Sequence, residues 1–172
     1  MIIQKSLRYG LQLGLGYTAY SILSYASNIN PTIQSILGLI VLILIIALWI
    51  VFATRVRRAN NESFTYGEAF TSLFFIALPG IVLSIIWSMI LLTSIDPELI
   101  ERTIETAAQA METFNKELTP EMIEEMRKGA TILGQIQALL IYILFMSAIS
   151  ALVALVIKKE ASPFASSNQT ID

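Results

Sequence analysis

Cysteine and histidine are both missing from this 172-residue sequence. Without them the chain can form no disulfide, and it lacks the thiolate nucleophile and the imidazole base of many enzymes. The usual ligand sets of zinc, haem and iron–sulfur sites are excluded as well. We therefore predict that the protein is not an enzyme and that it holds no metal and no cofactor.

Charged residues make up only 14% of the chain, whereas they make up about 25% of a typical soluble domain. Hydrophobic residues account for 55%, and the mean hydropathy is +0.70. The net charge of −2 gives no electrostatic reason to expect nucleic acid as a partner. This composition is typical of an integral membrane protein, so the lipid bilayer is the first expected partner.

Long uncharged runs predict an all-α, polytopic membrane protein. A helix rises about 1.5 Å per residue, so roughly 20 apolar residues cross a hydrocarbon core of about 30 Å. Four such spans are predicted, at residues 7–25, 36–53, 69–93 and 135–157. They form one domain over residues 1–159, followed by a flexible cytoplasmic tail at 160–172. The second span is rich in Leu, Ile and Val, and we expect it to be the most lipid-exposed.

Basic residues near the span ends indicate the direction of insertion. One side of the predicted membrane collects seven of them: Lys5, Arg8, Arg55, Arg57, Arg58, Lys158 and Lys159. On the other side, the segment 96–133 holds four basic and nine acidic residues. Both termini are therefore expected in the cytoplasm and the acidic segment outside. We expect Arg55, Arg57 and Arg58 to contact anionic lipid headgroups.

Small residues recur every four positions within three of the predicted spans. This spacing lets helix backbones approach closely inside a membrane. The predicted helix-packing residues are Gly10, Gly14, Gly80, Ser84, Ser88, Ser147 and Ala151. Pro79 lies inside the third span and predicts a kink. No Asp, Glu, Lys or Arg lies within the membrane core of any predicted span, which argues against a proton-coupled pump.

The outside segment 96–133 predicts an amphipathic helical hairpin, with arms at 97–118 and 120–133. Asp96-Pro97 and Thr119-Pro120 are typical helix starts, with a capping residue followed by proline. The predicted interface between the arms consists of Ile104, Met111, Phe114, Met122 and Met126. The alternative is that the first arm lies on the lipid surface. Its acidic polar face disfavours that arrangement, because helices lying on membranes are usually basic.

Three short motifs resemble a known family. Residues 64–70 read Phe-Thr-Tyr-Gly-Glu-Ala-Phe, residues 95–99 read Ile-Asp-Pro-Glu-Leu, and the last span closes on Lys158-Lys159. Together they resemble the domain-of-unknown-function 4199 family, over roughly residues 5–158. The resemblance implies a small four-span protein of the bacterial inner membrane, with the acidic segment in the periplasm. It implies no activity and no catalytic residue.

Two functions remain open at this stage. The first is a non-catalytic scaffold, accessory or regulatory subunit that acts through helix–helix contacts with a membrane-protein partner. The alternative is a small transporter or channel that works as a homo-oligomer, with a path lined by Pro79-Gly80 and the Ser/Gly faces.

Overall fold

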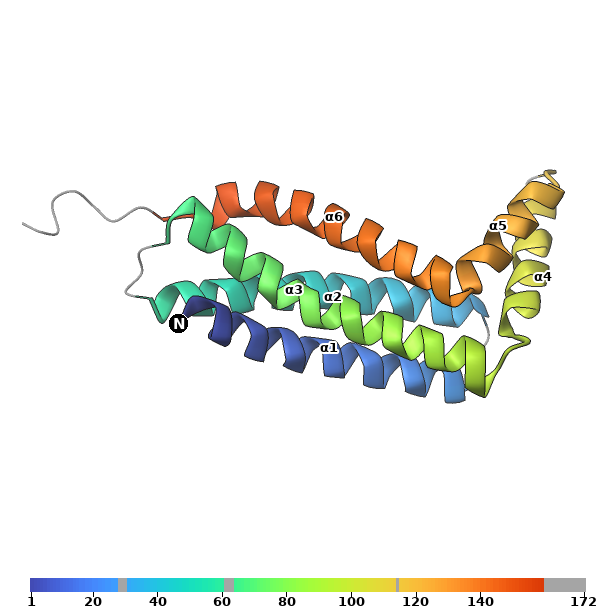
Figure 1. Cartoon of the computed structure of the whole chain (residues 1–172), viewed down its shortest axis with the longest axis horizontal. Coiled ribbons are helices and arrows are strands. Elements are labelled where there is room, and N and C mark those ends of the chain that lie inside the picture. The colour runs from blue at the N-terminus through green and yellow to red at the C-terminus, as the bar shows by residue number, and fades with distance from the viewer. Residues whose placement is uncertain (28–30, 61–63, 114, 160–172) are drawn as a thin grey trace, which may run out of the picture. The chain divides into compact units, whose positions relative to one another are not determined.

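The computed structural model describes residues 1–27, 31–60, 64–113 and 115–159, and these residues form helices joined by short links (Figure 1). The elements are α1 (Ile2–Ala26), α2 (Pro31–Arg58), α3 (Tyr66–Ile90), a π-helical turn η1 (Leu91–Ile95), α4 (Leu99–Glu112), α5 (Pro120–Ala130) and α6 (Ile132–Ile157). The predicted all-helical fold is confirmed. The predicted tail at 160–172 lies outside the described residues.

Three helical segments are long and apolar enough to cross a membrane: Ile33–Arg58, Tyr66–Ile95 and Ile132–Ile157. They contain the second, third and fourth predicted spans. Helix α1 contains the first predicted span and, at 25 residues, has sufficient length. It is more polar than the other three, with Gln12 and several Ser and Tyr residues along it. The four-span count therefore stays a prediction.

The chain divides into two compact units. Unit 1 consists of residues 1–80 and 144–159, and unit 2 is Ile81–Ile143. The core of unit 1 is formed by nine buried residues: Trp49, Ala53, Val56, Phe64, Ala69, Leu73, Ile76, Ala154 and Ile157. These residues come from α2, α3, α6 and the link before α3. Most of α2 up to Ile46 is exposed, whereas its last three turns enter the core.

The indole of Trp49 shows how α2 meets α3. Its Nε1–H donates a hydrogen bond to the carbonyl oxygen of Leu73 over 2.9 Å, in a buried position. A buried indole N–H needs an acceptor, and this bond supplies one. The tryptophan therefore fixes the approach of the two helices in the core of unit 1.

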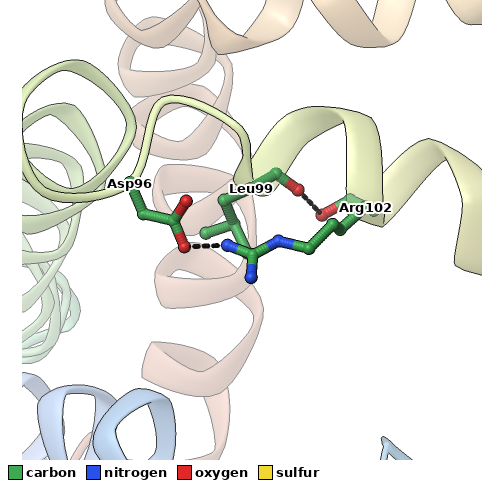
Figure 2. Close-up of polar contacts among 4 residues, drawn as sticks. Asp96, Leu99 and Arg102 are labelled. Carbon is green, nitrogen blue, oxygen red and sulfur yellow. Dashed lines mark hydrogen bonds and ion pairs between the residues drawn. The ribbon is translucent and has the colours of Figure 1, made fainter.

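Helix α4 is shorter than predicted at both ends. It begins at Leu99, with Glu98 and not Asp96 at its N-cap position, and the carboxylate of Asp96 is paired with the guanidinium of Arg102 (Figure 2). It ends at Glu112 and not at 118, because Asn115 adopts a left-handed conformation with φ 53°. The N–H of Lys116 then donates to Met111 and that of Asn115 to Glu112, which closes the helix.

Thr119 caps α5 as its sequence predicts, since its Oγ1 accepts a hydrogen bond from the N–H of Met122 over 3.3 Å. The helix stops at Ala130, three residues before the predicted end. Thr131 is extended, with ψ 159°, and its hydroxyl accepts from the N–H of Gly134. Thr131 is therefore the single residue between the end of α5 and the start of α6.

Candidate functional site

The described residues contain no group of three acidic, Cys or His side chains that could hold a metal ion. The candidate sites are therefore surfaces and helix contacts. Three such regions stand out: the end of unit 1 that carries its basic residues, the contact between α1 and α3, and the pair formed by α4 and α5.

The first region, here called the basic end, contains Lys5, Arg8, Arg55, Arg57, Arg58, Lys158 and Lys159. Specific contacts bring these distant positions together. The Lys5 ammonium donates to the carbonyl oxygen of Ala59 over 3.2 Å. Phe64 and Lys159 exchange two backbone hydrogen bonds of 2.7 and 2.8 Å. The start of α1, the end of α2, the start of α3 and the end of α6 therefore meet at one end of unit 1.

The Phe64–Ala69 stretch explains why the family-like motif has its residue types. Phe64 is fully buried in the core of unit 1 and also makes the backbone bridge to Lys159. Ala69, one turn into α3, is fully buried as well, where a small side chain allows close packing. Sequence reasoning singled out this motif for its resemblance and missed Phe64 as a structural residue.

Thr65 and Glu68 form a capping box at the start of α3. The N–H of Thr65 donates to the Glu68 carboxylate over 2.9 Å, and the N–H of Glu68 donates back to the Thr65 hydroxyl over 3.3 Å. This reciprocal arrangement satisfies two backbone donors that a helix start leaves free. The amide of Asn60 also donates to Glu68 over 3.3 Å, which links the end of α2 to the same carboxylate.

The three arginines predicted to contact lipid have different surroundings. The Arg57 guanidinium donates to the carbonyl oxygen of Ile157 over 3.0 Å, where a cation complements the C-terminus of α6. Arg55 is exposed, with its guanidinium 5.6 Å from the centre of the Phe52 ring. Arg58 is exposed. Their contact with lipid stays a prediction.

Helices α1 and α3 run parallel and meet through small residues. The buried hydroxyls of Ser6 and Ser72 form a 3.0 Å hydrogen bond. One turn further, a Cβ on Gly10 would lie only 2.5 Å from the carbonyl oxygen of Ile76. Another turn on, a Cβ on Gly80 would lie 3.6 Å from the Cα of Gly14.

The structure thus brings together three of the predicted packing residues, Gly10, Gly14 and Gly80. Sequence reasoning missed Ser6 and Ser72, although both continue the same four-residue spacing by one turn. On α6, Ser147 and Ala151 are half-buried, whereas Ser150 and Ala154 are fully buried. In unit 2, Ser84 and Ser88 are half-buried. Helix α3 continues through Pro79, the residue at which the sequence predicts a kink.

Helices α4 and α5 are joined by a two-pronged ion pair. The Nε and Nη2 of Arg127 donate to the two carboxylate oxygens of Glu101 over 2.9 and 2.8 Å. The start of α4 therefore lies beside the end of α5. These hydrogen bonds, and then the charge of Arg127, hold the pKa of Glu101 below its ordinary value, although both side chains are exposed.

The predicted interface residues of this pair differ in burial. Ile104 is buried, Met111 and Met126 are half-buried, and Met122 is exposed. Phe114 lies outside the described residues. Ile123, which the sequence analysis did not select, is half-buried next to Met122. Whether these side chains form the contact between the two helices stays a prediction.

The comparison with family models places these features in context. The family described as "Protein of unknown function (DUF4199)" matches residues 8–159. No curated protein and no solved structure matches the chain. The match contains both the basic end from Arg8 onward and the whole of α3 to α6, and it agrees with the resemblance carried by residues 64–70. The chain therefore belongs to the DUF4199 family of proteins of unknown function.

Proposed function

We propose that this protein is a four-span protein of the bacterial inner membrane and a non-catalytic scaffold or accessory subunit. Both termini lie in the cytoplasm, and α4 and α5 form a periplasmic hairpin. The observation that carries the proposal is the combination of apolar helices with an exposed, acidic helical pair.

The contact between α1 and α3 supports a fourth span. Over Ser6 to Gly14 the two helices pack in parallel, and α3 is apolar enough to cross a membrane. A helix packed along a membrane span lies at the same depth in the bilayer. The buried face of α1 holds Ser6, Gly10 and Gly14, while Leu11, Leu15 and Leu23 are exposed, as expected of a helix that faces lipid.

The charges on α4 and α5 support a partner outside the membrane. Ion pairs within unit 2 use the carboxylates of Asp96, Glu101 and Glu124. Five further exposed carboxylates have no ion-pair partner among the described residues: Glu98, Glu105, Glu112, Glu117 and Glu121. An acidic surface of this kind favours association with a basic surface of another protein.

The topology is tested by labelling introduced cysteines in intact cells, because the native chain has none. Ala59→Cys and Glu117→Cys place a thiol at two exposed positions, one after α2 and one before α5. We expect a membrane-impermeant maleimide to label residue 117 directly and residue 59 only after the cells are opened. Direct labelling of residue 59 with protection of residue 117 would reverse the proposed orientation.

The scaffold role is tested by purification in mild detergent followed by identification of bound proteins. We expect a stoichiometric partner, and we expect Glu105→Gln/Glu112→Gln to release it. The matched control is Thr103→Ala/Thr106→Ala, which changes two exposed residues of the same helix without changing its charge. A partner that stays bound to both variants contradicts recognition through the acidic surface. A homo-oligomer without other proteins favours the transporter alternative, in which Pro79-Gly80 and the serine faces line a path.

A further inference from the structure

Among the described residues of unit 1, basic side chains far outnumber carboxylates. Its described residues contain seven basic side chains, all at the basic end, and Glu68 is their only carboxylate. That carboxylate is already engaged by Thr65 and Asn60. Arg8 is exposed and has no hydrogen-bond or ion-pair partner among the described residues. Cationic groups that outnumber the acids around them create a positive potential that attracts an anion.

A half-enclosed pocket of about 370 Å³ lies within this region, between the start of α1 and the end of α2. It is lined by Lys5, Arg8, Tyr9, Gln12 and Ala59. Lys5 and Arg8 supply two cations, and the Gln12 amide can donate a further hydrogen bond. The lining contains no acidic residue. An arginine guanidinium can bind a phosphate through two parallel hydrogen bonds, and a lysine adds a point charge.

An aromatic stack holds the wall of the pocket in place. The rings of Tyr9 and Phe52 stack with centroids 4.8 Å apart and an angle of 20° between their planes. Arg55 lies against the same Phe52 ring, which adds a third cation beside the pocket. The Lys5 bond to Ala59 closes the other side. The pocket is therefore defined by contacts between two helices and not by one flexible side chain.

Helix α1 also carries an exposed apolar strip. Leu7, Leu11 and Leu15 are exposed at intervals of one helical turn along α1. Leu11 and Leu15 follow Arg8 by three and seven positions and so share its helix face, which places a phosphate bound by Arg8 beside a strip on which an acyl chain can rest. Basic pockets between membrane helices that continue into an apolar surface fit the headgroup and chain of an anionic phospholipid.

We propose that the pocket formed by Lys5, Arg8, Tyr9 and Gln12 is a binding site for the phosphodiester group of an anionic phospholipid. The ligand chemistry is a phosphate ester, and the Leu7–Leu11–Leu15 strip assigns it to a lipid. The site depends on insertion of the protein in a membrane and not on the proposed scaffold role. Failure to find a protein partner would leave it intact.

The test uses the full-length protein in nanodiscs of phosphatidylcholine with increasing phosphatidylglycerol, followed by native mass spectrometry and thermal unfolding. We expect retained phosphatidylglycerol on the native protein and a rise in its unfolding temperature. Arg8→Gln is expected to weaken lipid retention on the order of tenfold or more, as for a lost hydrogen bond to a charged group. Arg58→Gln is the matched control, because it removes one exposed arginine of the basic end outside the pocket.

A general attraction to the anionic surface would act on both arginines, with a loss of roughly fivefold each. Equal losses in Arg8→Gln and Arg58→Gln would therefore overturn the site. Arg8→Lys keeps the charge but not the two parallel hydrogen bonds, so it is expected to bind better than Arg8→Gln and less well than the native protein, which separates binding from folding. Glycerol 3-phosphate is added in phosphatidylcholine nanodiscs to test a free phosphate ester. If it stabilises the protein as strongly as the lipid does, the assignment to lipid is wrong.

Discussion

Ser6 and Ser72 are joined by a 3.0 Å hydrogen bond between two hydroxyls that no solvent reaches. The Ser6 hydroxyl donates and the Ser72 oxygen accepts, at a point where both helix backbones already use their own polar groups. In a buried position the alternative to such a bond is an unsatisfied polar group, so the pair fixes the register of α1 against α3. The two glycine contacts that follow, at Gly10 and Gly14, keep that register over two further turns.

Gly10→Ala is expected to separate α1 from α3. The new Cβ would lie 2.5 Å from the Ile76 carbonyl oxygen, and backbone on both sides leaves no side chain that could move. Overpacking of this kind costs about 1–3 kcal/mol. Gly16→Ala is the matched control, since its Cβ would meet no atom within 4 Å and alanine favours the helix. The midpoint temperature of thermal unfolding in detergent should fall for Gly10→Ala and not for Gly16→Ala. Equal midpoint temperatures for the two variants would show that the contact does not form.

Phe64→Ala is expected to lower the free energy of unfolding by about 3–5 kcal/mol, because a fully buried ring leaves a cavity. Tyr66→Ala removes a neighbouring aromatic ring that is 42% exposed, and it should cost far less. The amide protons of Phe64 and Lys159 should also lose hydrogen-exchange protection in Phe64→Ala, because the buried ring holds their bridge in place. Similar effects of the two variants would contradict the role of Phe64 in the core.

Gly134→Ala is expected to disturb the junction between α5 and α6. A Cβ at this position would overlap the carbonyl oxygen of Lys128 and lie 2.7 Å from the Cα of Gly129. Gly129→Ala is its control, because a Cβ there meets no atom within 4 Å. We expect faster hydrogen exchange over residues 128–136 only in Gly134→Ala. Unchanged exchange in that variant would mean that the close turn at Thr131 is absent.

The Glu101–Arg127 pair makes the contact between α4 and α5 dependent on pH. Hydrogen bonds from Arg127 lower the pKa of Glu101 from its ordinary 4.5. A carboxyl whose pKa is lower in the folded state stabilises that state above the unfolded pKa. This contribution is lost as the pH falls through the folded-state value. The contribution of this ion pair to the stability of the folded state is small, because both side chains are exposed.

The prediction is tested by following the Glu101 carboxyl by NMR during an acid titration. Arg127→Gln should return the pKa of Glu101 toward its ordinary value. Lys128→Gln should leave Glu101 unchanged and instead raise the pKa of Glu124, whose own lowering comes from a hydrogen bond to Lys128. A Glu101 titration that is the same in the native chain and in Arg127→Gln would disprove the pair.

Much of the helical architecture follows from the sequence alone. Uncharged runs of sufficient length predict helices wherever backbone groups must be satisfied without water. Three of the four predicted spans lie in α2, in α3 with η1, and in α6. Local signals also suffice at Thr119, where a capping residue and a proline occur together. Asn115 shows the limit of such signals. Its left-handed conformation ends α4 early, and an asparagine there is also compatible with a longer helix.

The contacts between helices were decided by the tertiary structure. The four-residue spacing of Gly10 and Gly14 predicts a close approach but names no partner, and the same spacing occurs on three helices. Only the fold shows that Ile76 and Gly80 lie opposite, and that the spacing extends to Ser6 and Ser72. The same holds for Phe64 and Lys159, which are 95 positions apart in the chain. Helix formation depends on neighbours within one turn, which the sequence contains, whereas packing depends on which surfaces meet in space.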